Sequence, residues 1–154
     1  MSTNTQSRKY LEAQIKTASK EQLLIMLYDG AINNCNMALE LIEANETEKA
    51  CDKLIKAQNI VAELISSLQF DKNEAVSKNL AALYGYVYIQ LMEGNTKQSA
   101  TQIHNSIKIL SSMKDTWLLA FEKVGVSKEN TTSGTPTPTV NSDSKVIGGL
   151  SVKA

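Results

Sequence analysis

The feature that most constrains the fold is a helical spacing of apolar residues that runs through most of the chain. Apolar side chains recur three or four residues apart in four successive segments, which begin near residues 20, 47, 72 and 96. This period is that of an amphipathic α-helix, and no segment shows the strict apolar–polar alternation of a strand. The only prolines, Pro136 and Pro138, lie beyond these segments, so no helix breaker interrupts them. The sequence predicts an all-α fold.

The predicted helix starts carry a pair of polar residues with the spacing of a capping box, in which each side chain bonds to the other residue's backbone. The pairs are Ser19 with Gln22, Asp71 with Glu74, and Asn95 with Gln98. Gly94-Asn95 is expected to end the third helix, and the fourth runs to Phe121. Because the connections are very short, neighbouring helices must run antiparallel. We therefore expect an up-down four-helix bundle over residues 19–124.

The two ends of the chain differ from the bundle in composition. Residues 1–18 carry Tyr10, Leu11 and Ile15 and are expected to form a short helix or an arm. Residues 125–154 are rich in Ser, Thr and Pro, which predicts a disordered, flexible tail. Within it, the stretch VIGGLSV is apolar enough to dock on the bundle, although a frayed end is the expected state.

Bulk composition excludes several classes of protein. Lys plus Arg and Asp plus Glu are balanced at 16 each, so no overall field attracts nucleic acid or an anionic membrane. No apolar run reaches the roughly 18 residues of a membrane span, and the first residues are too polar for a secretory signal. Cys35 and Cys51 are isolated thiols without metal spacing. We expect a cytoplasmic location, no membrane insertion and no nucleic-acid partner.

The third predicted helix carries more apolar surface than a bundle needs. Opposite its core stripe lie Ala82, Tyr86 and Ile89, with Met92 beside them. Ile55 and Ile60 of the second helix also lie off the core stripe. Either another segment covers these residues, most obviously the arm, or they form a groove for an apolar partner. The two alternatives are compatible if the arm covers a groove to which the partner later binds.

Candidate residues for catalysis are scarce. His104 is the only histidine, and Thr101 stands where a di-iron bundle would have a glutamate. A phosphotransfer histidine would have Lys108 one turn on, but the Lys-Gly expected three residues after the histidine is missing. No phosphate-binding or dinucleotide-binding glycine pattern occurs. We expect a surface histidine, no metal, no cofactor and no catalytic residue, and therefore a protein that is not an enzyme.

Four stretches, in this order, carry a family resemblance. They are Tyr10 followed by TASKEQLLIMLYDGAI, LIKAQNIVAELISSL, NLAALYGYVYIQLMEGN, and Trp117. Over about residues 8–121 the chain resembles the FliS family of bacterial flagellin export chaperones. Two positions depart from the family pattern, Lys20 in place of proline and Gly85 in place of a polar or acidic residue.

The resemblance implies a cytoplasmic export chaperone that binds the disordered C-terminal segment of flagellin. Such a chaperone prevents premature polymerisation and supports delivery of flagellin to the export gate of the flagellar type III apparatus. It also implies that an N-terminal arm covers part of the surface and gives way to the client. A bundle that self-associates through its surplus apolar face, or a phosphotransfer protein that uses His104, is the rival reading.

The predicted site has three parts. Carried over from the family, Tyr10 and Ile15 form the displaceable arm. The helical plots give four contact residues for the client, Ile55, Ile60, Tyr86 and Ile89. Four residues on core stripes are expected to support the groove without touching the client, namely Tyr28, Leu83, Tyr84 and Val87.

Asp29-Gly30 is a turn dipeptide in the middle of the first predicted helix, yet the helical period continues through it. A glycine there costs the helix roughly 1 kcal/mol relative to alanine. Gly30 plots on the outer side, beside an apolar edge. We therefore predict that the arm or the client crosses the helix near Gly30.

Overall fold

The computed structural model describes residues 2–69 and 72–133, and within them the side chains of 5–16, 18–69 and 72–123. This part of the chain forms helices and no strand. The helices are α1 (Ser2–Thr17), α2 (Lys20–Glu43), α3 (Thr47–Ser66), α4 (Glu74–Lys97) and α5 (Ala100–Ser133). The predicted all-α fold is confirmed.

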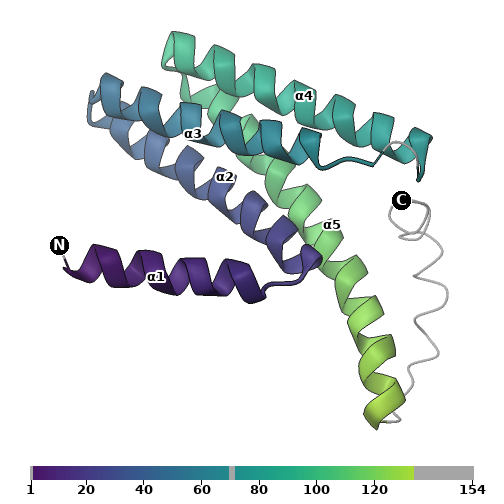
Figure 1. Ribbon diagram of the computed structural model, residues 1–154. Helices are drawn as coiled ribbons and strands as arrows, with labels where there is room; N and C mark the ends of the chain where they lie inside the picture. The colour runs from purple at the N-terminus through teal and green to yellow at the C-terminus, as the bar shows by residue number, and fades with distance from the viewer. Residues whose placement is uncertain (1, 70–71, 134–154) are drawn as a thin grey trace.

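Helices α2 to α5 form the bundle. α2 packs against α3 and α5, and α4 packs against the same two helices, so each helix lies beside its neighbours in the sequence and α5 closes the ring on α2 (Figure 1). The short connections force successive helices to run in opposite directions. This is the up-down, antiparallel bundle that the sequence predicts.

One stripe of each bundle helix is buried, and small residues are common on two of them. In α2 the buried residues are Tyr28, Ala31, Cys35 and Ala38, and in α3 they include Ala50 and Ala57. Larger side chains complete the interior, among them Leu54, Leu64, Val87, Leu91, Ile103 and Leu110. Small residues on α2 and α3 let the larger side chains of neighbouring helices approach closely.

The helix starts test the predicted caps. The Ser19–Gln22 capping box is confirmed, with Gln22 N donating to Ser19 Oγ at 3.2 Å and Ser19 N donating to Gln22 Oε1 at 2.9 Å. At the start of α4 the cap is Asn73, whose Oδ1 accepts from Val76 N at 3.1 Å. The predicted cap residue Asp71 lies outside the described residues.

The predicted boundary between the last two helices is wrong. α4 continues past Gly94-Asn95 to Lys97, Gln98 ends it with a left-handed backbone (φ 49°), and α5 begins at Ala100. Gly94 is buried, and a Cβ there would lie 3.0 Å from Ile103 Cγ1. This glycine therefore serves the close approach of α4 to α5, and it does not end the helix.

Two helical segments extend away from the bundle. α1 makes only sparse contacts with the other helices and lies apart from them in Figure 1. α5 passes the expected bundle boundary at residue 124 and runs to Ser133, leaving the bundle as a long single helix. Of the predicted tail, residues 134–154 lie outside the described part of the chain.

Candidate partner-binding surface

Three aromatic side chains join three helices through polar atoms inside the bundle. Tyr28 of α2 and Tyr84 of α4 share a hydrogen bond between their hydroxyl oxygens, 2.5 Å apart. Trp117 of α5 donates its Nε1–H to the Tyr28 hydroxyl at 3.1 Å. A buried polar group is costly unless it is paired, and here each group finds its partner on another helix. The trio fixes the register of α2, α4 and α5.

Burial keeps both tyrosines uncharged. Loss of solvation raises the pKa of Tyr28 well above its ordinary value, and the neighbouring Tyr84 raises it further. Loss of solvation likewise raises the pKa of Tyr84. Since a tyrosinate would have to form in an apolar interior, both hydroxyls stay protonated throughout the physiological range and can share their hydrogen bond.

An ion pair lies next to this trio. Lys114 of α5 contacts Asp29 of α2, with 2.5 Å between Nζ and Oδ1. Asp29 directly follows Tyr28, and Lys114 precedes Trp117 by one helical turn. The seam between α2 and α5 is therefore joined at two adjacent points.

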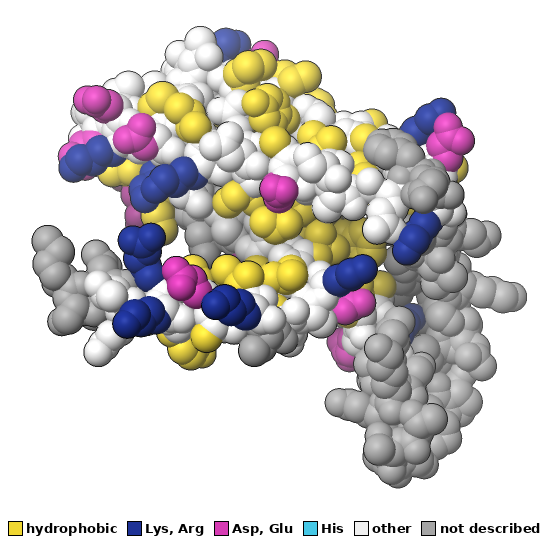
Figure 2. Space-filling model, viewed as in Figure 1, with side chains coloured by type: hydrophobic (Ala, Val, Ile, Leu, Met, Phe, Trp, Pro, Cys, Tyr) yellow, Lys and Arg dark blue, Asp and Glu magenta, His cyan; other side chains and the backbone are white. Residues whose placement is uncertain are grey.

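The outer face is an exposed apolar surface on the bundle, and we define it as Ile55 of α3 with Leu83, Tyr86, Ile89 and Met92 of α4. Tyr86 and Ile89 keep 50% and 51% of their surface exposed. Asn95 of α4 donates to Cys51 Sγ of α3, and Ile55 and Met92 lie about one helical turn from these two residues. Both therefore border the same α3–α4 seam. Figure 2 shows hydrophobic side chains gathered over α3 and α4.

The outer face contains one residue that the sequence placed in the interior. Tyr28, Tyr84 and Val87 are buried, as their stripes predict. Leu83 is 43% exposed, so its predicted place on the core stripe is wrong. It lies 100° round the helix from Tyr84, at the edge of the buried stripe. The buried stripe of α4 is thus narrower than the sequence pattern suggests.

Gly30 does accept another segment, but that segment is a bundle helix. A Cβ on Gly30 would lie 3.2 Å from Ile60 Cδ1 of α3. Ile60, which the sequence assigns to client contact, is partly buried and packs against the core. The prediction of an outer position for Gly30 is therefore wrong, because the pattern of one helix does not show where the next helix crosses it.

The arm does not cover the outer face in this structure. Tyr10 is 72% exposed, and Ile15 is exposed as well. In Figure 2, hydrophobic side chains line both sides of the hollow that separates α1 from the bundle. The alternative in which the arm hides Tyr86 and Ile89 is not the arrangement seen here.

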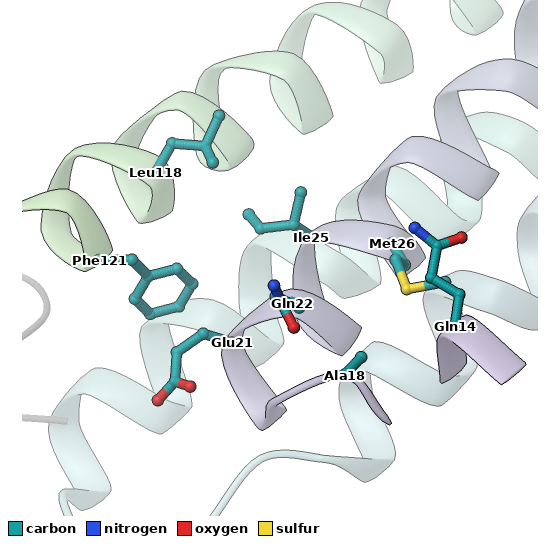
Figure 3. Close-up of a pocket in the computed structure, with 8 residues that line it drawn as sticks. All are labelled: Gln14, Ala18, Glu21, Gln22, Ile25, Met26, Leu118 and Phe121. Carbon is teal, nitrogen blue, oxygen red and sulfur yellow. The ribbon is translucent and has the colours of Figure 1, made fainter. Parts of the chain in front are cut away.

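A pocket of about 550 Å³ lies where the end of α1, the start of α2 and the outer part of α5 meet. In Figure 3, Ile25 on α2 lies across from Leu118 and Phe121 on α5, and Met26 lies beside Gln14 of α1. Phe121 stacks on Trp117 with 5.5 Å between ring centroids. The pocket thus adjoins the aromatic trio. The helical pattern of the sequence gives no sign of this pocket, because the pocket depends on how α2 and α5 diverge.

Other candidate chemistry is absent from the described residues. His104 is exposed, and no three His, Cys, Asp or Glu residues in the described part of the chain are grouped as a metal site requires. Nor does this part contain a helix long and apolar enough to cross a membrane.

The fold and the exposed surface define a class of all-α bundle proteins with an exposed apolar helix face. Comparisons with known proteins narrow this class. The family described as flagellar protein FliS matches residues 2–124. The chain belongs to this family of flagellar secretion chaperones, which function in flagellum biogenesis.

Several relatives carry the name flagellar secretion chaperone FliS, among them proteins of Bacillus subtilis and Salmonella typhimurium. The protein of Bacillus subtilis is 30% identical over 113 residues, which is 73% of this chain and 84% of the relative. The protein of Salmonella typhimurium is 30% identical over 108 residues, or 70% and 80% of the two chains. A crystal structure of a bacterial flagellar chaperone, 21% identical, matches with a TM-score of 0.65 over 78% of this chain and 98% of that one, which supports the fold.

Proposed function

We propose that this protein binds the C-terminal segment of flagellin in the cytoplasm and prevents its premature polymerisation. It then supports delivery of flagellin to the gate of the flagellar type III export apparatus. The observation that carries the proposal is the outer face, where large apolar side chains stay exposed on a bundle whose interior is already filled. Membership of a family of flagellar secretion chaperones supports a flagellar polypeptide as the client, and we assign that client to this surface.

The physical basis is recognition of an amphipathic helix. A client segment anchored at every third or fourth residue can lie along the α3–α4 seam and bury Tyr86, Ile89 and Ile55. Leu83 is exposed too, but it lies on the α5 side of α4, two turns from Gln90, which accepts a hydrogen bond from Asn105 of α5. Leu83 is therefore not among the seam contacts, and neither are Ile60 and Gly30, which face each other between α2 and α3.

Holding an unfolded segment needs no catalysis. The client pays the cost of ordering on binding, so a broad apolar contact is needed to offset it. Covering the segment that would otherwise assemble into a filament blocks polymerisation by competition. We propose a one-to-one complex, with Tyr28, Tyr84 and Val87 holding the surface rigid from inside the bundle.

The arm has a separate proposed role. Tyr10 and Ile15 are exposed on a helix that packs only sparsely on the rest of the protein. An isolated helix of this length is marginal in water, so α1 can move as a unit. We assign it the displaceable contact that gives way to the client.

The test is calorimetric titration of purified flagellin monomer into this protein, with full-length flagellin and with flagellin that lacks its C-terminal segment. Binding of the full-length form alone, at one client per chaperone, supports the proposal. Equal binding of both forms would refute it. A stable chaperone dimer that persists in the complex, measured by scattering, would favour self-association through the outer face.

A further inference from the structure

The pocket between α1, α2 and α5 is not part of the outer face, and none of its lining residues is among the proposed client contacts. Its apolar lining residues are Ile25 and Met26 of α2 and Leu118 and Phe121 of α5, and Gln14 and Gln22 add polar groups (Figure 3). Glu21 places a carboxylate at the lining. A volume of about 550 Å³ lies in the range of sites that hold ligands of several side chains' size. Apolar side chains that line an open pocket are stabilised when an apolar group covers them.

We propose that residues 146–152 of the same chain, VIGGLSV, occupy this pocket. Between residues 127 and 145 the only aliphatic side chain is Val140, whereas the next seven residues contain Val146, Ile147, Leu150 and Val152. A short apolar cluster that follows a polar connection is typical of a tethered ligand. Apolar side chains that stay in water gain nothing from being clustered, whereas a cluster can be buried together in one pocket.

The connection has the length that the geometry requires. α5 leads from Phe121 in the pocket wall to Ser133, which at 1.5 Å per residue is about 18 Å. From Ser133 to Val146 there are 146 − 133 = 13 residue steps. A flexible chain of this length spans about 20 Å on average. The average span therefore matches the return distance, which is the condition for the highest local concentration of a tethered ligand.

Shape and charge also fit. Gly148-Gly149 separates two small apolar groups and lets the segment bend between the two walls of the pocket. Lys145 and Lys153 flank the segment, and either can approach the carboxylate of Glu21 at the lining. A tether of this length gives a local concentration of the order of millimolar, so even a weak intrinsic affinity keeps the pocket filled.

The test uses the full chain with ¹³C-methyl-labelled Ile and Met, and reads the NMR signals of Ile25 and Met26. The variant Ile147→Asp/Leu150→Asp puts charges into the segment. Val140→Asp is the matched control, since it makes the same kind of change within the polar connection. A synthetic peptide of residues 144–154 is then added to the double variant. No flagellin is present, so the result does not depend on the proposed function.

We expect the double variant to shift the Ile25 and Met26 signals, the control to leave them in place, and the peptide to return them toward the wild-type positions. Identical signals in all three proteins would overturn the proposal. So would a shift that changes with protein concentration, which would mean that a second copy supplies the segment. If Leu11→Asp in α1 moves the signals and the double variant does not, the occupant is α1.

Discussion

The two sides of α4 are both apolar, yet they are used differently. On the inner side Tyr84, Val87 and Leu91 are buried against the other three bundle helices. On the outer side Tyr86, Ile89 and Met92 alternate with them along the sequence and stay half exposed. The difference lies in the partners and not in the residue types. Composition alone therefore shows that α4 has more apolar surface than the core needs. Only the packing of the helices shows which side of α4 stays exposed.

Buried hydrogen bonds are a second difference between the inner and outer sides of α4. The inner tyrosine, Tyr84, has its hydroxyl paired with Tyr28, and Trp117 completes the trio. The inner side is consequently fixed in one arrangement, because any shift would leave a buried polar group unpaired. A rigid inner side makes the outer side a preformed surface, and a preformed surface loses less entropy on binding.

The largest expected effect comes from truncating neighbouring residues on opposite sides of the helix. Leu91→Ala should lower the free energy of unfolding by about 2–5 kcal/mol, because it leaves a cavity in a filled core. Met92→Ala, one residue on, should change it by no more than about 0.5 kcal/mol. Urea unfolding followed by circular dichroism measures both. Equal losses would mean that the two sides are packed alike.

The next test breaks the polar anchor. Tyr28→Phe and Tyr84→Phe each remove one hydroxyl of the buried pair and should each cost about 1–3 kcal/mol, because a partner is left unpaired. The double variant should cost less than the sum of the two, by about 0.5 kcal/mol or more. Tyr86→Phe on the outer side should be nearly neutral. Additive losses in the double variant would show that the two hydroxyls do not interact.

Alkaline pH provides a third test of the inner side. Burial raises the pKa of the Cys35 thiol from 9.0 to about 12. The unfolded chain therefore releases this proton first, and stability present below pH 9 is lost as the pH rises toward about 12. Each such group contributes a slope of up to about 1.4 kcal/mol per pH unit.

The tyrosines add to this loss at higher pH. Since the pKa of Tyr28 is raised above 10.0, its contribution falls away only above pH 10. Unfolding titrations in urea at pH 8 to 11 should show a shallower decline for Cys35→Ala than for the wild type. The same decline in both proteins would contradict the assigned burial of the thiol.

The smallest expected effects come from two glycines of α4. Gly85 has nothing within 4 Å of the position of a Cβ, so Gly85→Ala should stabilise the protein by about 0.5–1 kcal/mol through helix propensity. Gly94→Ala should destabilise it, because the new Cβ would lie 3.0 Å from Ile103 Cγ1. Thermal unfolding measures both, and destabilisation by Gly85→Ala would show that this part of α4 is covered.

Local sequence patterns predicted much of this structure. The range of α2 and its Ser19–Gln22 capping box follow from spacing and cap chemistry within a few residues. The exposed positions of Tyr86, Ile89 and Ile55 follow from their angle around each helix. These features need no knowledge of how distant segments pack.

Features that depend on two helices could not be predicted in this way. Tyr28 and Tyr84 are separated by 56 residues, and Tyr28 and Trp117 by 89. Their bonds require the register of three helices, which no single stripe contains. The predictions of an outer position for Gly30 and of a buried Leu83 fail for the same reason. How neighbouring helices cross decides both the contact of Ile60 with Gly30 and the exposure of Leu83. The end of α4 was predicted too early because Gly94 has the sequence features of a helix end, whereas its role is close packing against α5.

We propose that the outer face binds flagellin while the inner side of α4 holds that face in place. The most direct measurement is the affinity of full-length flagellin for Tyr86→Asp/Ile89→Asp, by calorimetric titration, together with the thermal stability of the free variant. We predict an affinity at least about tenfold weaker, as expected for loss of central apolar anchors, with an unfolding temperature close to that of the wild type. Unchanged affinity in a folded variant would show that flagellin does not bind through Tyr86 and Ile89.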